Sequence, residues 1–97
     1  MVLLDFWAPW CGPCRNFAKI YELVAKEHPD IVFAKVNIEE QPALKDDFNI
    51  RSIPHLIIFR TNIALYSEPG VLTMSSLEAL IKKALEAGRQ LIPATRS

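Results

Sequence analysis

Cys11 and Cys14 are the only cysteines in the chain, and they stand three positions apart in the segment Trp10-Cys11-Gly12-Pro13-Cys14. Such a pair can stabilise a fold, bind a metal or exchange disulfides with another molecule. As a stabilising disulfide it would close a loop of about 4 residues, which contributes about 2 kcal/mol in the chain-entropy model, against about 4.7 kcal/mol for a loop of about 100 residues. A purely structural role would therefore gain little.

A zinc site would need a second pair of ligands at short spacing. The two histidines, His28 and His55, are isolated in the sequence, and neither supplies such a partner. The residue types therefore favour thiol–disulfide exchange, in which one thiolate attacks a disulfide and a second thiol resolves the mixed disulfide.

The local sequence predicts that the pair lies at the start of a helix that runs from Cys11 to just before Pro29. The apolar residues at helical spacing are Phe17, Ile20, Tyr21 and Val24. Free N–H groups and the positive dipole end at a helix start favour a thiolate. Gly12 lets the chain approach closely without a Cβ, and Pro13 suits the first turn, where its missing N–H has no role. We expect an exposed nucleophile at Cys11 and a more buried resolving thiol at Cys14.

The rest of the pattern predicts a small sheet that positions this helix. Val2 to Trp7 form an apolar run interrupted by Asp5, which indicates a strand inside a parallel-type sheet. A short helix has Pro42 in its first turn and Asn49 as a left-handed stop. In the hairpin, Ile63 occupies the place where a glycine would ease a positive φ. The other expected strands span residues 31–36, 56–59 and 63–66.

A last helix opens at Ser75-Ser76-Leu77-Glu78, which fits a capping box, and runs to Gly88. The predicted order is strand, helix, strand, helix, strand, strand, helix. This order indicates an α/β fold with a parallel crossover unit, a hairpin and a covering helix.

The composition excludes several classes of protein. The chain has 97 residues, of which 51% are hydrophobic, so we expect one folded domain. The 11 basic and 11 acidic residues cancel, and no cluster of cations is present for nucleic acids or anionic membranes. No apolar run approaches the roughly 18 residues of a membrane helix. Since no basic region precedes an apolar leader, we expect a cytoplasmic protein.

The segment Asp5-Phe6-Trp7-Ala8-Pro9-Trp10-Cys11-Gly12-Pro13-Cys14 resembles the active-site segment of the thioredoxins. The resemblance continues in order through Ala34-Lys35-Val36-Asn37-Ile38, Ile50-Arg51-Ser52-Ile53-Pro54 and Gly70. It implies the thioredoxin fold with a central four-stranded mixed sheet flanked by helices. It also implies a thioredoxin domain over residues 1–88 and a C-terminal tail over residues 89–97.

The resemblance implies a protein-disulfide reductase of the thioredoxin type. Cys11 would attack a client disulfide, and Cys14 would resolve the mixed disulfide that forms. Asp5 matches the acidic residue of the central strand that takes up the proton of the second cysteine in this family. Burial would raise the pKa of Asp5, which suits a proton acceptor, and a solvated charge is the alternative. Lys35 would pair with Asp5 and tune it, or stand as a solvated edge charge.

The resemblance also implies a substrate groove. Pro54 matches the proline that follows a cis peptide bond in this family, whereas only about 5–6% of bonds before proline are cis in folded proteins generally. Trp10, Ile53, Pro54 and Gly70 would form an apolar rim around Cys11 that accepts an extended segment by strand addition. Ordinary packing is the alternative for Trp10.

Members of the family usually have a further strand and helix before the segment that begins here at Val2. We therefore expect residues 31–36 to form a sheet edge, and a monomer or a weak homodimer through that edge. The three glycines form no glycine-rich loop for a nicotinamide or flavin nucleotide, so no cofactor is expected. The resemblance implies a flavin-dependent thioredoxin reductase as electron donor and disulfide-bearing proteins as clients.

Three alternatives stand beside the reductase. One is a thioredoxin-like interaction module with little turnover, against which the intact Cys-Gly-Pro-Cys segment argues. Another is an oxidant or isomerase in an oxidising compartment, which the proline between the cysteines disfavours by analogy with the family. The last is a metal clip shared by two chains.

Overall fold

The computed structural model describes residues 1–90 and contains one four-stranded sheet in that part of the chain. The strands are β1 (Val2–Trp7), β2 (Val32–Asn37), β3 (His55–Arg60) and β4 (Ile63–Pro69), in the spatial order β2-β1-β3-β4. β1 pairs parallel with β2 and antiparallel with β3, and β3 pairs antiparallel with β4. The sheet is therefore mixed, with β1 in its interior as predicted.

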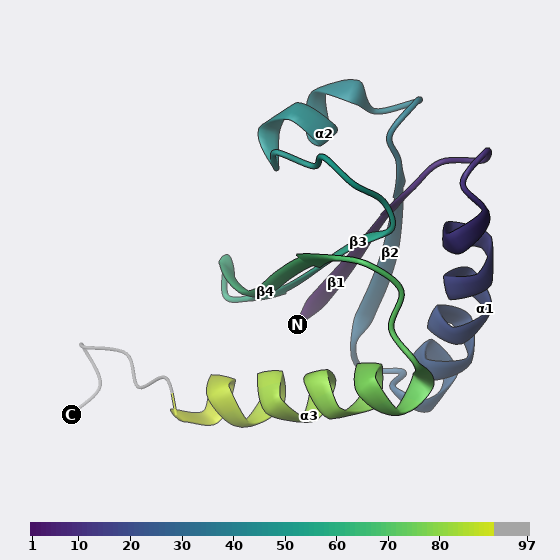
Figure 1. Cartoon of the computed structure of the whole chain (residues 1–97). Coiled ribbons are helices and arrows are strands. Elements are labelled where there is room, and N and C mark those ends of the chain that lie inside the picture. The colour runs from purple at the N-terminus through teal and green to yellow at the C-terminus, as the bar shows by residue number, and fades with distance from the viewer. Residues whose placement is uncertain (91–97) are drawn as a thin grey trace.

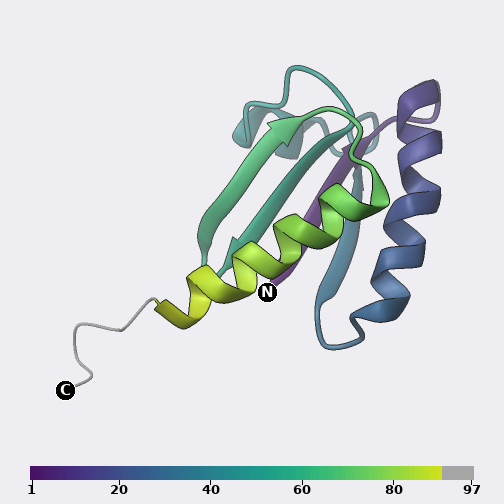
Figure 2. The ribbon, with the colours of Figure 1, turned by 60° about the horizontal axis from the view of Figure 1, so that its bottom comes forward.

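The helices lie on both sides of this sheet (Figures 1 and 2). They are α1 (Gly12–Glu27), α2 (Pro42–Asp47) and α3 (Met74–Gln90). α1 and α3 cover one face, because their apolar sides pack on Leu3 of β1 and on Leu56 and Ile58 of β3. α2 lies at the other face, where Leu44 and the ring of Phe48 pack near Phe6.

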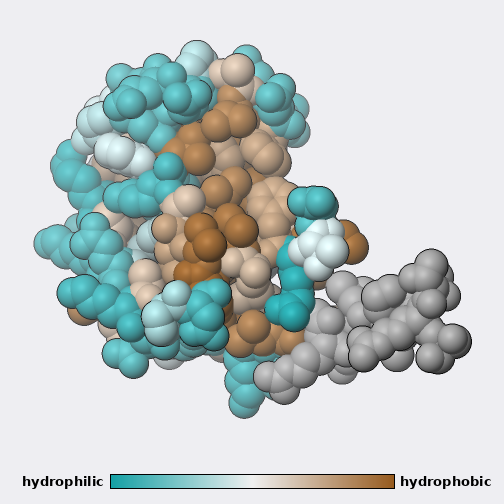
Figure 3. All heavy atoms as spheres, turned by 180° about the vertical axis from the view of Figure 1, so that it is seen from behind, coloured by the Kyte–Doolittle hydropathy of each residue, from teal (hydrophilic) through white to brown (hydrophobic). Residues whose placement is uncertain are grey.

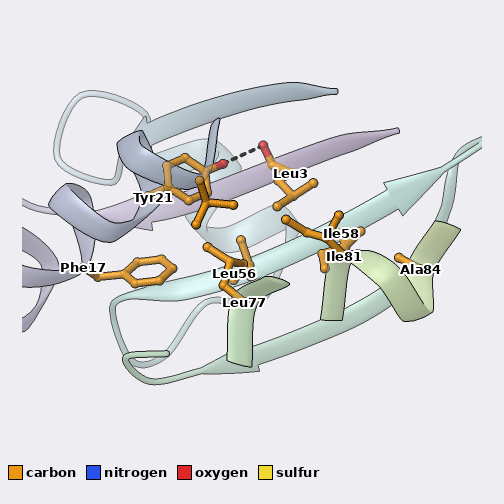
Figure 4. Close-up of a cluster of buried hydrophobic side chains, with 9 residues drawn as sticks. Leu3, Phe17, Tyr21, Leu56, Ile58, Leu77, Ile81 and Ala84 are labelled. Atoms are coloured by element: carbon orange, nitrogen blue, oxygen red, sulfur yellow. Dashed lines mark hydrogen bonds between the residues drawn. The ribbon is translucent and has the colours of Figure 1, made fainter. Parts of the chain in front are cut away.

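The main core forms between α1, α3 and the sheet (Figure 4). Its buried residues are Leu3, Phe17, Tyr21, Val24, Leu56, Ile58, Leu77, Ile81 and Ala84. The hydroxyl of Tyr21 lies 3.0 Å from the carbonyl oxygen of Leu3 and 2.8 Å from that of Ala34. Since a hydroxyl has one proton, the donation is shared between β1 and β2. This contact holds α1 at a fixed height on the sheet.

The ends of α3 differ from the prediction. The side-chain oxygen of Thr73 accepts a hydrogen bond from the backbone N–H of Ser76 at 3.1 Å, so Thr73 and not Ser75 caps the helix. The helix also continues past Gly88 to Gln90. The expected division between a domain over residues 1–88 and a tail stays a prediction, and residues 91–97 lie outside the described part of the chain.

The hairpin turn lies at Thr61 and Asn62, as the sequence predicts, but the prediction that Ile63 holds the position that favours glycine is wrong. Thr61 and Asn62 both have a positive φ, of 52° and 62°, and Ile63 is already the first residue of β4. Positive φ at both central positions is typical of the two-residue turn whose twist matches that of the paired strands. The position that favours glycine is therefore held by Asn62, a residue that tolerates this conformation.

β2 is an edge strand of the sheet within residues 1–90, as predicted. Its Val32 is 56% exposed.

Hydrophobic side chains gather in a band that runs from top to bottom of the view from behind (Figure 3). No helix among the described residues is long and apolar enough to cross a bilayer.

The shared hydrogen bond of Tyr21 makes a testable contribution to stability. We expect Tyr21→Phe to lower the free energy of unfolding by about 1–2 kcal/mol, because two buried carbonyl groups lose a donor. Urea denaturation would measure this loss, with the dependence of the unfolding free energy on urea concentration unchanged. Tyr66→Phe is the matched control, since the half-buried Tyr66 makes no hydrogen bond through its hydroxyl within residues 1–90. Equal effects of the two substitutions would contradict the assignment.

Candidate active site

The cysteine pair lies at the connection between β1 and α1. The backbone N–H of Cys11 donates to the carbonyl of Ala8 at 3.1 Å, which closes a turn directly after the strand. Cys11 then serves as the N-cap of α1, and its Sγ accepts a hydrogen bond from the backbone N–H of Cys14 at 3.2 Å. The two residues are joined by a disulfide, with Cα atoms 5.2 Å apart. The predicted placement at the helix start is confirmed.

The exposure of the two cysteines corrects one expectation. Cys11 is 5% exposed and Cys14 is 1% exposed, so the first cysteine is the more accessible of the two. Cys11 is nevertheless a buried residue and not an exposed one. The reason is that both cysteines pack with Ala8 into a small cluster that Trp7, Ile38 and Ile53 also contact.

Asp5 lies in the middle of β1, on the same face of the sheet as Trp7. Its side chain is fully buried, and neither carboxyl oxygen has a hydrogen-bond partner among the described residues. Burial raises the pKa of Asp5 from 3.8 to about 7, while the positive charge of Lys35 acts in the opposite direction. The alternative of a solvated charge is therefore wrong for this residue. A carboxyl that titrates near neutrality can take up and release a proton at working pH.

Lys35 is paired with Asp5 in the register of β1 and β2, but the two side chains do not form a hydrogen bond. The ammonium group instead lies 4.8 Å from the centre of the Trp7 ring, in a cation–π arrangement. Of the two alternatives, direct pairing with Asp5 is wrong, and Lys35 is an exposed residue of the edge strand β2 whose charge lowers the pKa of Asp5.

The loop before β3 faces the disulfide. The peptide bond between Ile53 and Pro54 is cis, as the resemblance implied. The carbonyl oxygen of Ile53 lies 3.9 Å from Sγ of Cys11. The carbonyl of Pro54 accepts a hydrogen bond from the backbone N–H of Gly70 at 2.8 Å, and Gly70 has a φ of +116° that favours glycine. The end of β4 therefore holds this loop in place.

The remaining predicted residues fall at the start of α1. Trp10 is 66% exposed, which is unusual for so large an apolar side chain. Pro13 lies in the first helical turn as predicted. The close approach expected at Gly12 is wrong, because a Cβ there would meet only Nη2 of Arg15, at 4.0 Å.

Sequence reasoning missed two neighbours of the disulfide and one contact of the turn before it. Trp7 and Ile38 pack against the cysteine cluster. Their positions were predictable, because Trp7 ends β1 and Ile38 directly follows β2. Arg15 donates from Nη1 to the carbonyl of Pro9 at 2.9 Å, so its side chain folds back over the turn before the helix. A basic residue directly after the second cysteine was the signal available for Arg15.

Comparison with known proteins agrees with this geometry. A sequence model of the thioredoxin family matches residues 1–83. The chain belongs to the thioredoxin family. The solution structure of oxidised thioredoxin from Plasmodium falciparum superimposes with a TM-score of 0.76 and 34% sequence identity, over 86% of this chain and 79% of that one. The mixed sheet and its helices are therefore the thioredoxin fold.

Two relatives show how much of the family the chain spans. A Streptomyces coelicolor protein that carries a thioredoxin name is 48% identical over 83 residues, which are 86% of this chain and 62% of that protein. Thioredoxin from Porphyra purpurea is 39% identical over 83 residues, which are 84% of this chain and 78% of that one. The chain thus spans less than two thirds of the Streptomyces protein's length.

The buried carboxyl of Asp5 makes stability depend on pH. Folding raises the pKa of this carboxyl, so the unfolded chain loses the proton at a lower pH than the folded chain does. Stability therefore falls as pH rises between the two pKa values. We expect the loss to begin near pH 3.8, to be complete above about pH 7 and to reach roughly 4 kcal/mol. Urea denaturation across this range would measure it.

Asp5→Asn should remove this component, while Asp30→Asn, at an exposed position, should leave it in place. Parallel stability curves for Asp5→Asn and the unmodified chain would contradict a buried titrating carboxyl.

Proposed function

We propose that this chain is a thiol–disulfide oxidoreductase that reduces the disulfides of client proteins. The observation that carries the proposal is the disulfide at the start of α1, whose Cys11 Sγ lies 3.9 Å from the carbonyl of Ile53. A backbone carbonyl beside a reactive sulfur gives an extended client segment a place to bind next to the thiol. The chemistry and the docking position therefore coincide.

The proposed reaction starts from the dithiol form. The thiolate of Cys11 attacks one sulfur of the client disulfide, and the other client sulfur leaves as a thiolate that takes up a proton. Cys14 then loses its proton and attacks Cys11, which releases the second client sulfur. The client gains two electrons and two protons, and the Cys11–Cys14 disulfide forms.

The N-terminal position favours Cys11 as the nucleophile. The backbone N–H of Cys14 donates to Sγ of Cys11 at 3.2 Å, and the same donor would stabilise a thiolate at Cys11. Cys14, with 1% exposure, is protected from the client and suited to resolve the mixed disulfide.

We assign Asp5 as the acceptor of the proton that Cys14 loses. Its carboxyl is buried, has no partner to hold it in the ionised form, and has its pKa raised to about 7 by that burial. Lys35 is proposed as a tuning residue, because its positive charge limits the rise in the pKa of Asp5.

The client groove is proposed to consist of Trp10, Ile53, Pro54 and Gly70. Trp10 supplies a large exposed apolar surface next to Cys11, and Gly12 and Pro13 shape the turn that carries the nucleophile. Gly70 holds the carbonyl of Pro54, which leaves the backbone of Ile53 free to pair with an extended chain.

The cellular setting is proposed by analogy with the family. Electrons would come from a thioredoxin reductase, the protein would serve redox homeostasis in the cytoplasm, and its state would be a monomer or a weak homodimer through β2. Residues 1–88 would act as the thioredoxin domain, with residues 89–97 as a tail.

The two cysteines should give different variant phenotypes. We expect the chain to accelerate the reduction of a protein disulfide by dithiothreitol, and Cys11→Ser to abolish the acceleration. Cys14→Ser should instead accumulate a mixed disulfide with the client, visible by mass spectrometry of alkylated samples. Acceleration by Cys11→Ser equal to that of the unmodified chain would refute the role of Cys11.

The redox potential separates a reductant from an oxidant or isomerase. We expect a potential below about −260 mV, which is more reducing than cytosolic glutathione by extraction, whereas oxidising family members lie between about −120 and −180 mV. Equilibration with glutathione mixtures followed by alkylation would measure it. A value in the upper range would replace the reductase with an oxidant.

A further inference from the structure

Arg15 places a positive charge against the turn that leads into the disulfide. Its Nη1 donates to the carbonyl of Pro9 at 2.9 Å, and its Nη2 lies 4.0 Å from the point where a Cβ on Gly12 would stand. Pro9 and Gly12 enclose the exposed Trp10 and the nucleophile Cys11 in the sequence. The guanidinium group therefore lies against the turn that carries Trp10 and Cys11.

The helix does not explain this charge. The first turn of a helix favours acidic residues, since they complement the positive end of the dipole, and cations there are unfavourable. The first turn of α1 has no acidic residue and is followed at once by Arg15. Lys19, one turn further on, adds a second positive charge on the same face. The stability of α1 would be better served by a neutral or acidic side chain.

No carboxylate of the described residues neutralises Arg15. Within residues 1–90 the ion pair present is that of His28 with Glu78, far along α1. A guanidinium group has five N–H donors, and the contact with Pro9 uses one of them. The remaining donors are exposed and suited to a carboxylate, which arginine binds in bidentate form.

We propose that Arg15 is a specificity-determining residue that binds an acidic side chain next to the reactive cysteine of the client. The inference rests on the proposed disulfide reductase activity and names the clients it favours: proteins with Asp or Glu beside the disulfide. Glu39 and Glu40, which follow Ile38 at the cysteine cluster, are exposed carboxylates of opposite sign. Because these charges also act on the client, only variants of Arg15 can assign the preference for acidic clients to this residue.

The test uses three disulfide-linked peptides that differ only in the residue next to the reactive cysteine, which is Glu, Gln or Lys. For the full chain in its dithiol form, we expect the second-order rate constant of a single turnover to be about two- to five-fold larger with the Glu peptide than with the Lys peptide, as for an exposed ion pair. Arg15→Gln should bring the three peptides level, because it removes the positive charge. Arg15→Glu should reverse the order.

Lys26→Gln is the matched control, because Lys26 is an exposed cation in the last turn of the same helix. It should leave the preference unchanged. The preference should also shrink at about 1 M salt, where the Debye length is about 3 Å.

The outcomes separate two failures. If no peptide is reduced by the unmodified chain, the reductase activity itself fails. If all three peptides are reduced at equal rates, or if Arg15→Gln slows all of them by the same factor, the reductase activity stands and the proposal is overturned. The latter result would mean that Arg15 acts on the thiolate of Cys11 and not on the client.

Discussion

The height of α1 on the sheet is the constraint on which the rest of the site depends. One hydroxyl, that of Tyr21, lies within hydrogen-bond distance of carbonyl groups on both β1 and β2. Because α1 is a rigid rod at this length, the contact in its middle also fixes its first turn. The position of the turn from Ala8 to Cys11 is then fixed, and the disulfide lies opposite the cis peptide bond before Pro54. A structural contact in the core thereby determines the position of the chemistry.

Asp5 shows the opposite relation between stability and chemistry. An aliphatic residue in the interior strand would carry no desolvation cost, yet the sequence places an unpartnered carboxyl there. The same burial that weakens the fold as pH rises toward neutrality moves the pKa of Asp5 to about 7, where a carboxyl can exchange a proton. Lys35 moderates the effect from the neighbouring strand without a direct contact. Maximal stability and a carboxyl with a pKa near 7 are incompatible at this position.

The order of the elements and the placement of the cysteines could be predicted because they rest on local patterns. Apolar spacing predicted α1, and the missing N–H of Pro13 suited its first turn. Features that depend on distant neighbours could not be read from residue types. The cis bond before Pro54 came only from resemblance, since sterics alone favour trans. The burial of Cys11 depends on Ile38 and Ile53, which meet it only after folding. Thr73, and not Ser75, caps α3 because the chain enters the helix two residues earlier than its pattern suggested.

The hairpin tip has a practical consequence. Thr61 is β-branched and holds a φ of 52°, a conformation that such residues rarely adopt, so the paired strands on either side must impose it. β3 begins one residue after Pro54 and runs away from the disulfide for six residues, which is about 20 Å. A fluorescent dye or a surface tether attached at this tip would leave the reactive sulfur unobstructed. The molecule could in this way be immobilised with its disulfide directed away from the surface.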